Sequence, residues 1–448
     1  MALLSRALLV TAVFLTPFTA PHTSSAATRC VSSVPYVSGR DGYATYRIPA
    51  AVTTRRGTLL AFAEGRRHGA GDTGDIDVVL RRSTDGGCTW GPLQVVAAGD
   101  GDTRGNPAPV VDPRTGAVVL LTSFNSGTVT EAQIMRGEVP PEHGRRVFVQ
   151  RSGNDGRDFS APRDITRQVK PAGWRWYATG PGHAVALTRG PHAGRLVVPA
   201  NHSAAPPAGS PDTGRESRYY GGHAIYSDDG GRSWRLGFVD GTYDGVTNAN
   251  ESSAAQLPDG RLYFSARDQA GSSPGNRLDS YSSDGARSLD RPYAAQPTLD
   301  DVPVVQGSVL HLDRLGGLLL FSGPSVPTAR REMALWRSVD GGATFTKAVT
   351  LSRQRAAYSD LVRVGRGTVG VLYETGDTGT YDTIEFRRVD VTELRGPGGG
   401  GAPSLTAGGG EGGAPSVTAG RPPSGTRAPV PPRPATAAPG APPSPGSR

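Results

Sequence analysis

The chain has 448 residues, a formal net charge of +8, eight His and two Cys. The basic charge favours an anionic partner, but the Arg residues are scattered without a Lys/Arg run or a recognised binding motif, so no nucleic acid partner is expected. The His residues form no metal-binding pair, and we expect neither a metal nor another cofactor.

The first 27 residues have the pattern of a secretory signal peptide. Arg6 lies near the start, an apolar run follows at Ala7–Leu15, and Ser25-Ala26-Ala27 supplies small residues for cleavage. The apolar run is too short to cross a bilayer, so no membrane span is predicted. We therefore expect a secreted protein whose mature chain begins near residue 28.

Residues 28–395 are predicted to form the folded part. Short strand-like runs at 59–62, 118–121 and 318–321 are separated by stretches rich in Gly and Asp. No segment of this part has the period of an amphipathic helix. The composition therefore indicates an all-β fold.

A turn motif of the form Ser-x-Asp-x-Gly-x-Thr-Trp recurs in the folded part, intact or degenerate. Its five copies begin at Ser83, Ser152, Ser227, Ser282 and Ser338. The Ser and Asp side chains can bond nearby backbone amides, the Gly allows a positive φ, and the aromatic residue can pack into a sheet. These aspartates are therefore predicted to be structural rather than catalytic.

The spacing of the copies, 55 to 75 residues, is too long and uneven for a helical solenoid and suits a sheet repeat with variable loops. Six four-stranded blades of about 60 residues each would fill the folded part. We predict a six-bladed β-propeller that acts as a monomer. Residues 396–448, nearly all Gly, Pro, Ala, Ser and Thr, are predicted to be a disordered tail.

Cys30 and Cys88 are the two cysteines, one near the start of the mature chain and one inside the first turn motif. A disulfide between them is compatible with an exported protein, and closure of a propeller by its first segment would bring them together. The sequence leaves this pairing open.

The segment Tyr46-Arg47-Ile48-Pro49 precedes the first turn motif. Such a segment upstream of several of these turns resembles the exo-sialidases (neuraminidases) of bacterial and animal type, and the resemblance extends from about residue 36 to 389. It implies a six-bladed β-propeller that removes terminal α-linked sialic acid from sialylated glycans, namely glycoproteins, glycolipids and oligosaccharides.

The resemblance implies three arginines that bind the carboxylate of the sugar, and the matching residues are Arg47, Arg267 and Arg330. Each guanidinium can donate paired, charge-assisted hydrogen bonds, and it keeps its charge at any working pH. Arg331 is an alternative to Arg330 because it is adjacent. The register against the turn at Ser338 favours Arg330.

The resemblance also implies a Tyr nucleophile, matched by Tyr358, and a Glu that takes its proton, matched by Glu251. Sialic acid carries a carboxylate on its anomeric carbon, so an attacking Asp or Glu would meet a like charge at close range. A tyrosine approaches as a neutral group. Glu251 and the arginines would lower the cost of forming the phenolate.

The general acid/base is placed by the same resemblance at Asp72, in the Gly-rich segment 63–77, which we expect to be a loop. Asp75 and Asp77 are rivals, one as a turn residue and one as the entry to a strand. Arg66 and Asn106 are predicted to contact the substrate. A Gly-flanked carboxyl group can protonate the leaving oxygen and then activate water, as a retaining double displacement requires.

Two other functions remain open at this point. A propeller with these turns could bind glycans without cleaving them, although such a protein would be expected to lack Tyr358 or Glu251. Alternatively, the enzyme could transfer sialic acid to another sugar, or cleave by intramolecular attack, as trans-sialidases do.

Overall fold

β-Strands provide nearly all the regular structure in the computed structural model, which describes residues 30–270, 276–313 and 317–395. By its internal contacts the chain divides into Met1–Gly399 and Gly400–Arg448, and every described residue belongs to the first unit. The predicted signal peptide, residues 1–27, and the predicted tail, residues 396–448, lie outside the described residues.

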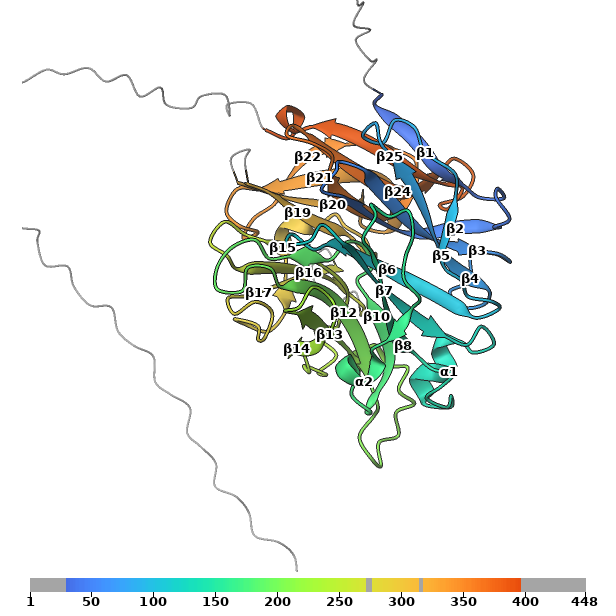
Figure 1. Cartoon of the computed structure of the whole chain (residues 1–448). Coiled ribbons are helices and arrows are strands. Elements are labelled where there is room, and N and C mark those ends of the chain that lie inside the picture. The colour runs from blue at the N-terminus through green and yellow to red at the C-terminus, as the bar shows by residue number, and fades with distance from the viewer. Residues whose placement is uncertain (1–29, 271–275, 314–316, 396–448) are drawn as a thin grey trace, which may run out of the picture. The chain divides into compact units, whose positions relative to one another are not determined.

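The strands form four sheets (Figure 1). One sheet contains β2 (Thr45–Thr53), β3 (Leu59–Arg66), β4 (Ile76–Ser83), β5 (Gln94–Ala97), β6 (Thr103–Val111), β7 (Val118–Asn125), β8 (Arg146–Ser152) and β9 (Arg163–Asp164). A second contains β10 (Trp174–Thr179), β11 (Val185–Ala186), β12 (Leu196–Ala204), β13 (Tyr220–Ser227) and β14 (Arg235–Val239). A third contains β15 (Ala249–Gln256), β16 (Leu262–Asp268), β17 (Arg277–Ser282) and β18 (Ala294–Ala295).

The fourth sheet combines the last strands of the described chain with the first one. It contains β1 (Ser32–Val37), β19 (Ser308–Leu312), β20 (Leu318–Val326), β21 (Ala329–Ser338), β22 (Thr346–Thr350), β23 (Arg355–Arg363), β24 (Thr368–Gly376) and β25 (Thr383–Asp390). The helices that the structure describes with bounds are all short: α1 (Glu131–Arg136), α2 (Thr166–Val169), η1 (Ser217–Tyr219), η3 (Pro297–Leu299) and η5 (Val391–Leu394). The prediction of an all-β fold is confirmed.

Each of the two larger sheets is held together at one point by a single residue pair. These pairs are Ile76 with Thr103, between β4 and β6, and Arg331 with Arg355, between β21 and β23. Divided at these two points, the described strands fall into six antiparallel groups, and β1 completes the last group by pairing antiparallel with β25. Figure 1 shows this first strand beside the last one.

The apolar core lies between neighbouring groups of strands. One buried cluster joins Val119 and Val149 of β7 and β8 to Val198 and Ile225 of β12 and β13. Burying a side chain of this size stabilises the fold by about 1.5–3 kcal/mol. Among the described residues, no helix is long and apolar enough to cross a membrane.

The five turn motifs have the predicted structure. Ser83 donates to Asp85 (2.7 Å) and accepts from the amide of Gly87 (2.8 Å), while Asp85 accepts from the amides of Cys88 and Thr89 (both 3.0 Å). The serine of every other copy accepts the equivalent amide. None of the motif aspartates lies in the cavity described below. These aspartates therefore shape the turns, as predicted from their chemistry.

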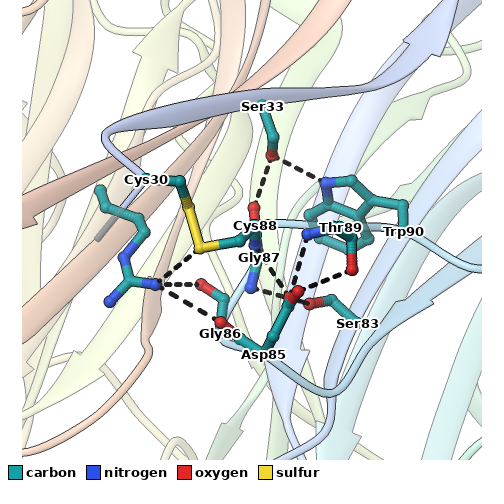
Figure 2. The surroundings of a disulfide bond; sticks show 10 residues. Cys30, Ser33, Ser83, Asp85, Gly86, Gly87, Cys88, Thr89 and Trp90 are labelled. Atoms are coloured by element: carbon teal, nitrogen blue, oxygen red, sulfur yellow. Dashed lines mark hydrogen bonds between the residues drawn. A yellow bond between two sulfur atoms is a disulfide. The ribbon is translucent and has the colours of Figure 1, made fainter. Parts of the chain in front are cut away.

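Cys30 and Cys88 form a disulfide, which answers the question that the sequence left open (Figure 2). It links the segment before β1 to the first turn motif. Ser33 reinforces this link by donating to the carbonyl of Gly87 (2.5 Å) and accepting from the indole of Trp90 (2.8 Å). The start of the described chain is thus attached to two neighbouring groups of strands, covalently to the first and by strand pairing to the last.

Candidate active site

All eight residues predicted to form the site line one cavity of about 210 Å³. They are Arg47, Arg66, Asp72, Asn106, Glu251, Arg267, Arg330 and Tyr358. Further residues line the same cavity, and those used below are Glu64, Glu131, Arg145, Trp176 and Gln269. Among the described residues, no group of three or more His, Cys, Asp or Glu is placed to hold a metal ion.

Five of the side chains that line the cavity lie at irregular points in the first strands of five groups. The pairing register shifts in β2, β6, β10, β15 and β23. The shifts enclose Asn106 in β6, Trp176 in β10, Glu251 in β15 and Tyr358 in β23, and the shift in β2 begins at Arg47. Bulges redirect a side chain that regular pleating would place elsewhere. Five separate bulges therefore contribute side chains to this cavity.

Tyr358 and Glu251 are in direct contact. The Tyr358 hydroxyl donates to Glu251 Oε1 at 2.6 Å, and Arg267 Nη1 donates to Glu251 Oε2 at 3.0 Å and to the Tyr358 hydroxyl at 3.4 Å. Burial raises the pKa of Tyr358 above its ordinary value, Glu251 raises it further, and Arg267 and Arg47 partly oppose both effects. The phenol is therefore neutral at neutral pH, with a proton acceptor already in place.

Arg47 is held by a buried carboxylate that sequence reasoning missed. Its Nε donates to Glu374 Oε1 at 3.2 Å, and the guanidinium carbon lies 5.0 Å from the centre of the Tyr358 ring. Glu374, whose side chain is fully buried, also accepts from the amides of Ile48 (2.9 Å) and Tyr358 (3.1 Å). Ile48 has a φ of 58°, which is rare for a β-branched residue and marks strain at this bulge. One carboxylate thus orients both the first arginine and the predicted nucleophile.

Asp72 projects into the cavity from a loop shorter than expected. The predicted loop covered residues 63–77, but residues 63–66 belong to β3 and residues 76–77 belong to β4. The loop spans only 67–75, because the two strands stay paired as far as Arg66 and Ile76. Asp72 Oδ1 accepts from Arg66 Nη1 (2.8 Å) and Arg47 Nη1 (3.2 Å). The surrounding cavity wall keeps part of the solvent away from Asp72, which raises its pKa, but the charges of Arg66 and Arg47 outweigh this effect and hold the pKa below its ordinary value.

The two rival aspartates lie outside the cavity. Asp77 is buried in β4, where it accepts from the Tyr43 hydroxyl (2.6 Å) and from the amide of Gly99 (2.7 Å). Asp75 forms an ion pair with Arg67 at 3.3 Å. Both carboxylates therefore stabilise local structure.

Arg330 lines the cavity, and the adjacent Arg331 is exposed and does not. Arg330 donates to the Tyr381 hydroxyl at 3.1 Å, and its guanidinium lies 5.7 Å from the centre of the Tyr358 ring. Successive residues of a strand point to opposite faces, so only one of these two arginines can face the cavity.

A second buried carboxylate, Glu64, organises another part of the cavity wall. It accepts from Arg66 Nη2 (2.6 Å) and from the amide of Asn106 (2.8 Å). Arg145 donates to Asn106 Oδ1 (3.2 Å) and lies 3.6 Å over the Trp176 ring. Burial lowers the pKa of Arg145 to about 10. Glu64 could have been found from the sequence, because it is a charged residue inside an apolar strand. Such a charge is rarely buried without a partner.

Three arginine nitrogens of this cavity are buried without a hydrogen-bond partner among the described residues, Nη2 of Arg47, Nε of Arg145 and Nε of Arg267. Buried donors are nearly always satisfied, so unpaired ones beside a cavity indicate a ligand that accepts hydrogen bonds. A carboxylate is the group that suits a cluster of guanidinium forks best.

Several known proteins are similar to this chain in sequence. The family described as "BNR repeat-like domain" matches residues 57–371. A sialidase of Micromonospora viridifaciens is 33% identical over 356 residues, covering 76% of this chain. An exo-alpha-sialidase of Aspergillus fumigatus is 30% identical over 387 residues, covering 80% of this chain and 86% of that protein. The chain spans 51% of the Micromonospora protein's length.

A solved sialidase structure resembles this fold. The solved structure of the Hadza microbial sialidase Hz136 superposes with a TM-score of 0.68 at 26% identity, covering 80% of this chain and 68% of that one. Sequence and structure therefore point to the same group of proteins. The chain belongs to the sialidase family and carries its BNR repeat-like domain.

Proposed function

We propose that this protein is an exo-α-sialidase that hydrolyses terminal α-linked sialic acid from glycans with retention of configuration. The observation that carries the proposal is the 2.6 Å hydrogen bond from Tyr358 to Glu251 in a cavity that is also lined by Arg47, Arg267 and Arg330, the three arginines predicted to bind the carboxylate. A sugar-binding site without catalysis needs no such nucleophile and base pair.

The carboxylate of the sugar binds to Arg47, Arg267 and Arg330. Its two oxygens accept hydrogen bonds that the unpaired nitrogens of Arg47 and Arg267 now lack. Binding also gives Arg47 a new anionic partner, so its contact with Asp72 weakens. The pKa of Asp72 therefore rises toward the value that a general acid needs.

In the first step the Tyr358 oxygen attacks the anomeric carbon, and Glu251 takes the phenol proton. The bond to the leaving group breaks as Asp72 protonates the leaving oxygen. This step produces a covalent bond between Tyr358 and the sugar, and it inverts the anomeric centre.

In the second step Asp72, now a carboxylate, takes a proton from water as the water oxygen attacks the anomeric carbon. The bond to Tyr358 breaks, and Glu251 returns the proton to the phenolate. The second inversion restores the original configuration.

We further propose that the six antiparallel groups of strands are the blades of a six-bladed propeller. The pairing of β1 with β25 supports this arrangement, because it gives the last group a strand from the start of the described chain. In such a propeller the first strands of the blades line the axis. The convergence of five of those strands on one cavity is consistent with it.

The protein is proposed to act outside the cell. The signal-peptide pattern of residues 1–27 and the Cys30–Cys88 disulfide support export, because disulfides persist mainly in oxidising compartments. Recovery of the protein from the culture medium with its first residues removed would test this proposal, and retention of full-length protein in the cells would refute it.

Turnover of a fluorogenic sialoside by the wild type and by Tyr358→Phe and Asp72→Ala variants tests the mechanism. We expect both variants to lose at least about 100-fold in kcat, the usual contribution of such groups. Tyr281→Phe, which removes the hydroxyl of a partly buried tyrosine outside the cavity, is the control. Full activity of Tyr358→Phe would exclude this residue as the nucleophile.

Product analysis by NMR separates hydrolysis from transfer. Retaining hydrolysis releases free α-sialic acid first. A sialylated sugar would indicate transfer, and an anhydro sugar would indicate intramolecular attack. Binding of sialosides without any product would identify a non-catalytic binding protein.

A further inference from the structure

A second pocket of about 440 Å³ adjoins the active-site cavity and shares three of its lining residues, Asp72, Glu131 and Gln269. The Asp72 side chain is 63% exposed, much more than the other ion-paired side chains of the cavity, such as Arg66 at 3%. Asp72 thus lies at the border between the two spaces. We name the second space the outer groove.

The walls of the outer groove are connected to each other. One wall is α1, and the other is the connection from β12 to β13 that contains Arg215 and η1. Arg175 joins them, because its Nη1 donates to the carbonyls of Met135 in α1 (2.6 Å) and of Thr213 (3.3 Å). Tyr220 makes a second connection by donating to Glu131 at 2.6 Å. Side-chain hydrogen bonds therefore hold the two walls of the outer groove together.

Hydroxyl groups and one cation line the outer groove away from the inner cavity. The hydroxyls belong to Thr73, Thr130 and Ser217, and the cation is Arg215. The Arg215 side chain is exposed, and within the described residues it takes part in no ion pair with a distance of 4.0 Å or less. Such a lining offers donors and acceptors beside the apolar side chains of Ala132 and Met135, which suits a sugar ring with its hydroxyl groups and its C–H faces.

We propose that the outer groove is the subsite for the leaving-group sugar, and that it takes a neutral hexose. The inference rests on the proposed function, in which Asp72 protonates the oxygen that joins sialic acid to its leaving group. That oxygen must lie within hydrogen-bonding distance of Asp72 when it leaves. With sialic acid in the inner cavity, the rest of the glycan then extends past Asp72 into the outer groove.

The carboxylate at the inner end of the groove favours a neutral sugar over a second sialic acid. Asp72 lies at this inner end, where the first leaving-group ring lies. In the free protein this group is a carboxylate, because the charges of Arg66 and Arg47 outweigh the effect of burial on its pKa. A leaving group with its own carboxylate would approach Asp72 closely as it binds, and like charges at short range are unfavourable. The groove therefore discriminates against sialic acid linked to sialic acid.

The test compares kcat/KM for sialyl-lactose with kcat/KM for 4-methylumbelliferyl sialoside, whose aromatic leaving group carries no sugar hydroxyls. The variants are Arg215→Ala and Ser217→Ala, and the control is Arg287→Ala, an exposed arginine that lines neither space. The ratio of the two kcat/KM values does not depend on the fraction of folded protein, because that fraction cancels. A folding defect therefore cannot produce the expected result.

We expect the ratio to fall about tenfold in Arg215→Ala and about fivefold in Ser217→Ala, the typical effects of losing a charged and a neutral hydrogen bond, and to stay unchanged in Arg287→Ala. A disialyl substrate should be cleaved with a lower kcat/KM than sialyl-lactose. Ratios within twofold of the wild type in both groove variants would overturn the subsite alone. A disialyl substrate preferred over sialyl-lactose would overturn the neutral sugar. A wild-type protein that cleaves no sialoside would overturn the proposed function as well.

Discussion

Replacing Glu374 by Gln isolates the contribution of one buried charge to both stability and catalysis. The substitution keeps the shape of the side chain but removes the anion beside Arg47. It also leaves one carboxamide oxygen in place of two carboxylate oxygens. In the wild type, Oε1 accepts from Arg47 and from the amide of Ile48, and Oε2 accepts from the amide of Tyr358. One of these donors must then face an NH2 group.

The magnitude follows from these contacts. Removing one partner of a buried ion pair costs about 3–5 kcal/mol, and leaving a buried amide without its acceptor costs about 1–3 kcal/mol. Asp72 still contacts Arg47 at 3.2 Å, but its exposed carboxylate is partly screened by water and compensates only in part. We expect the free energy of unfolding to fall by about 4 kcal/mol, near the middle of the first range because the two costs overlap and Asp72 offsets part of them.

Equilibrium unfolding in urea measures this loss, with Glu142→Gln as a control at an exposed glutamate. Kinetics on a sialoside should show a raised KM, because Arg47 loses its orientation, and a lowered kcat, because the amide of Tyr358 is released. An unfolding free energy within about 0.5 kcal/mol of the wild type, the normal range for surface substitutions, would refute the role assigned to Glu374.

Three further perturbations test the disulfide, the third arginine and the acid. Replacing Cys30 and Cys88 by Ser should lower the free energy of unfolding, measured in urea, by about 4 kcal/mol, which is the chain-entropy value for a cross-link between residues 58 positions apart. A loss of less than about 1 kcal/mol would contradict this expectation. Arg330→Ala should raise the KM for a sialoside at least about tenfold, because the contact with the sugar carboxylate is lost, whereas Arg331→Ala should leave the KM unchanged. Equal effects of the two variants would refute Arg330 as the third carboxylate-binding arginine. In the free protein the arginines lower the pKa of Asp72, and a bound carboxylate should raise it. The reaction requires protonated Asp72, so its rate falls as the pH rises through the pKa of this group. The fall should occur at a higher pH in the profile of kcat, which reports the bound state, than in the profile of kcat/KM, which reports the free protein. A fall at the same pH in both profiles would contradict this mechanism.

Sequence reasoning succeeded where the chemistry is local. The turn around Asp85 depends on side chains within four residues of it, so its motif predicts its hydrogen bonds without knowledge of the fold. Arg47 and Tyr358 carry recognisable neighbours, which allowed their residue numbers to be matched to a family pattern. Their presence in one cavity agrees with that match.

Sequence reasoning failed where a residue acts through partners far along the chain. Glu374 lies 327 positions from Arg47, and only the pairing of β24 with β23 and the packing of β2 against them bring the two together. Nothing near Glu374 in sequence identifies its partner. A carboxylate within an apolar strand does indicate that a cation or several amides must lie opposite, since burying it alone would be prohibitive. The sequence could therefore show that Glu64 and Glu374 have buried partners, and only the fold identifies those partners as the residues that shape the cavity.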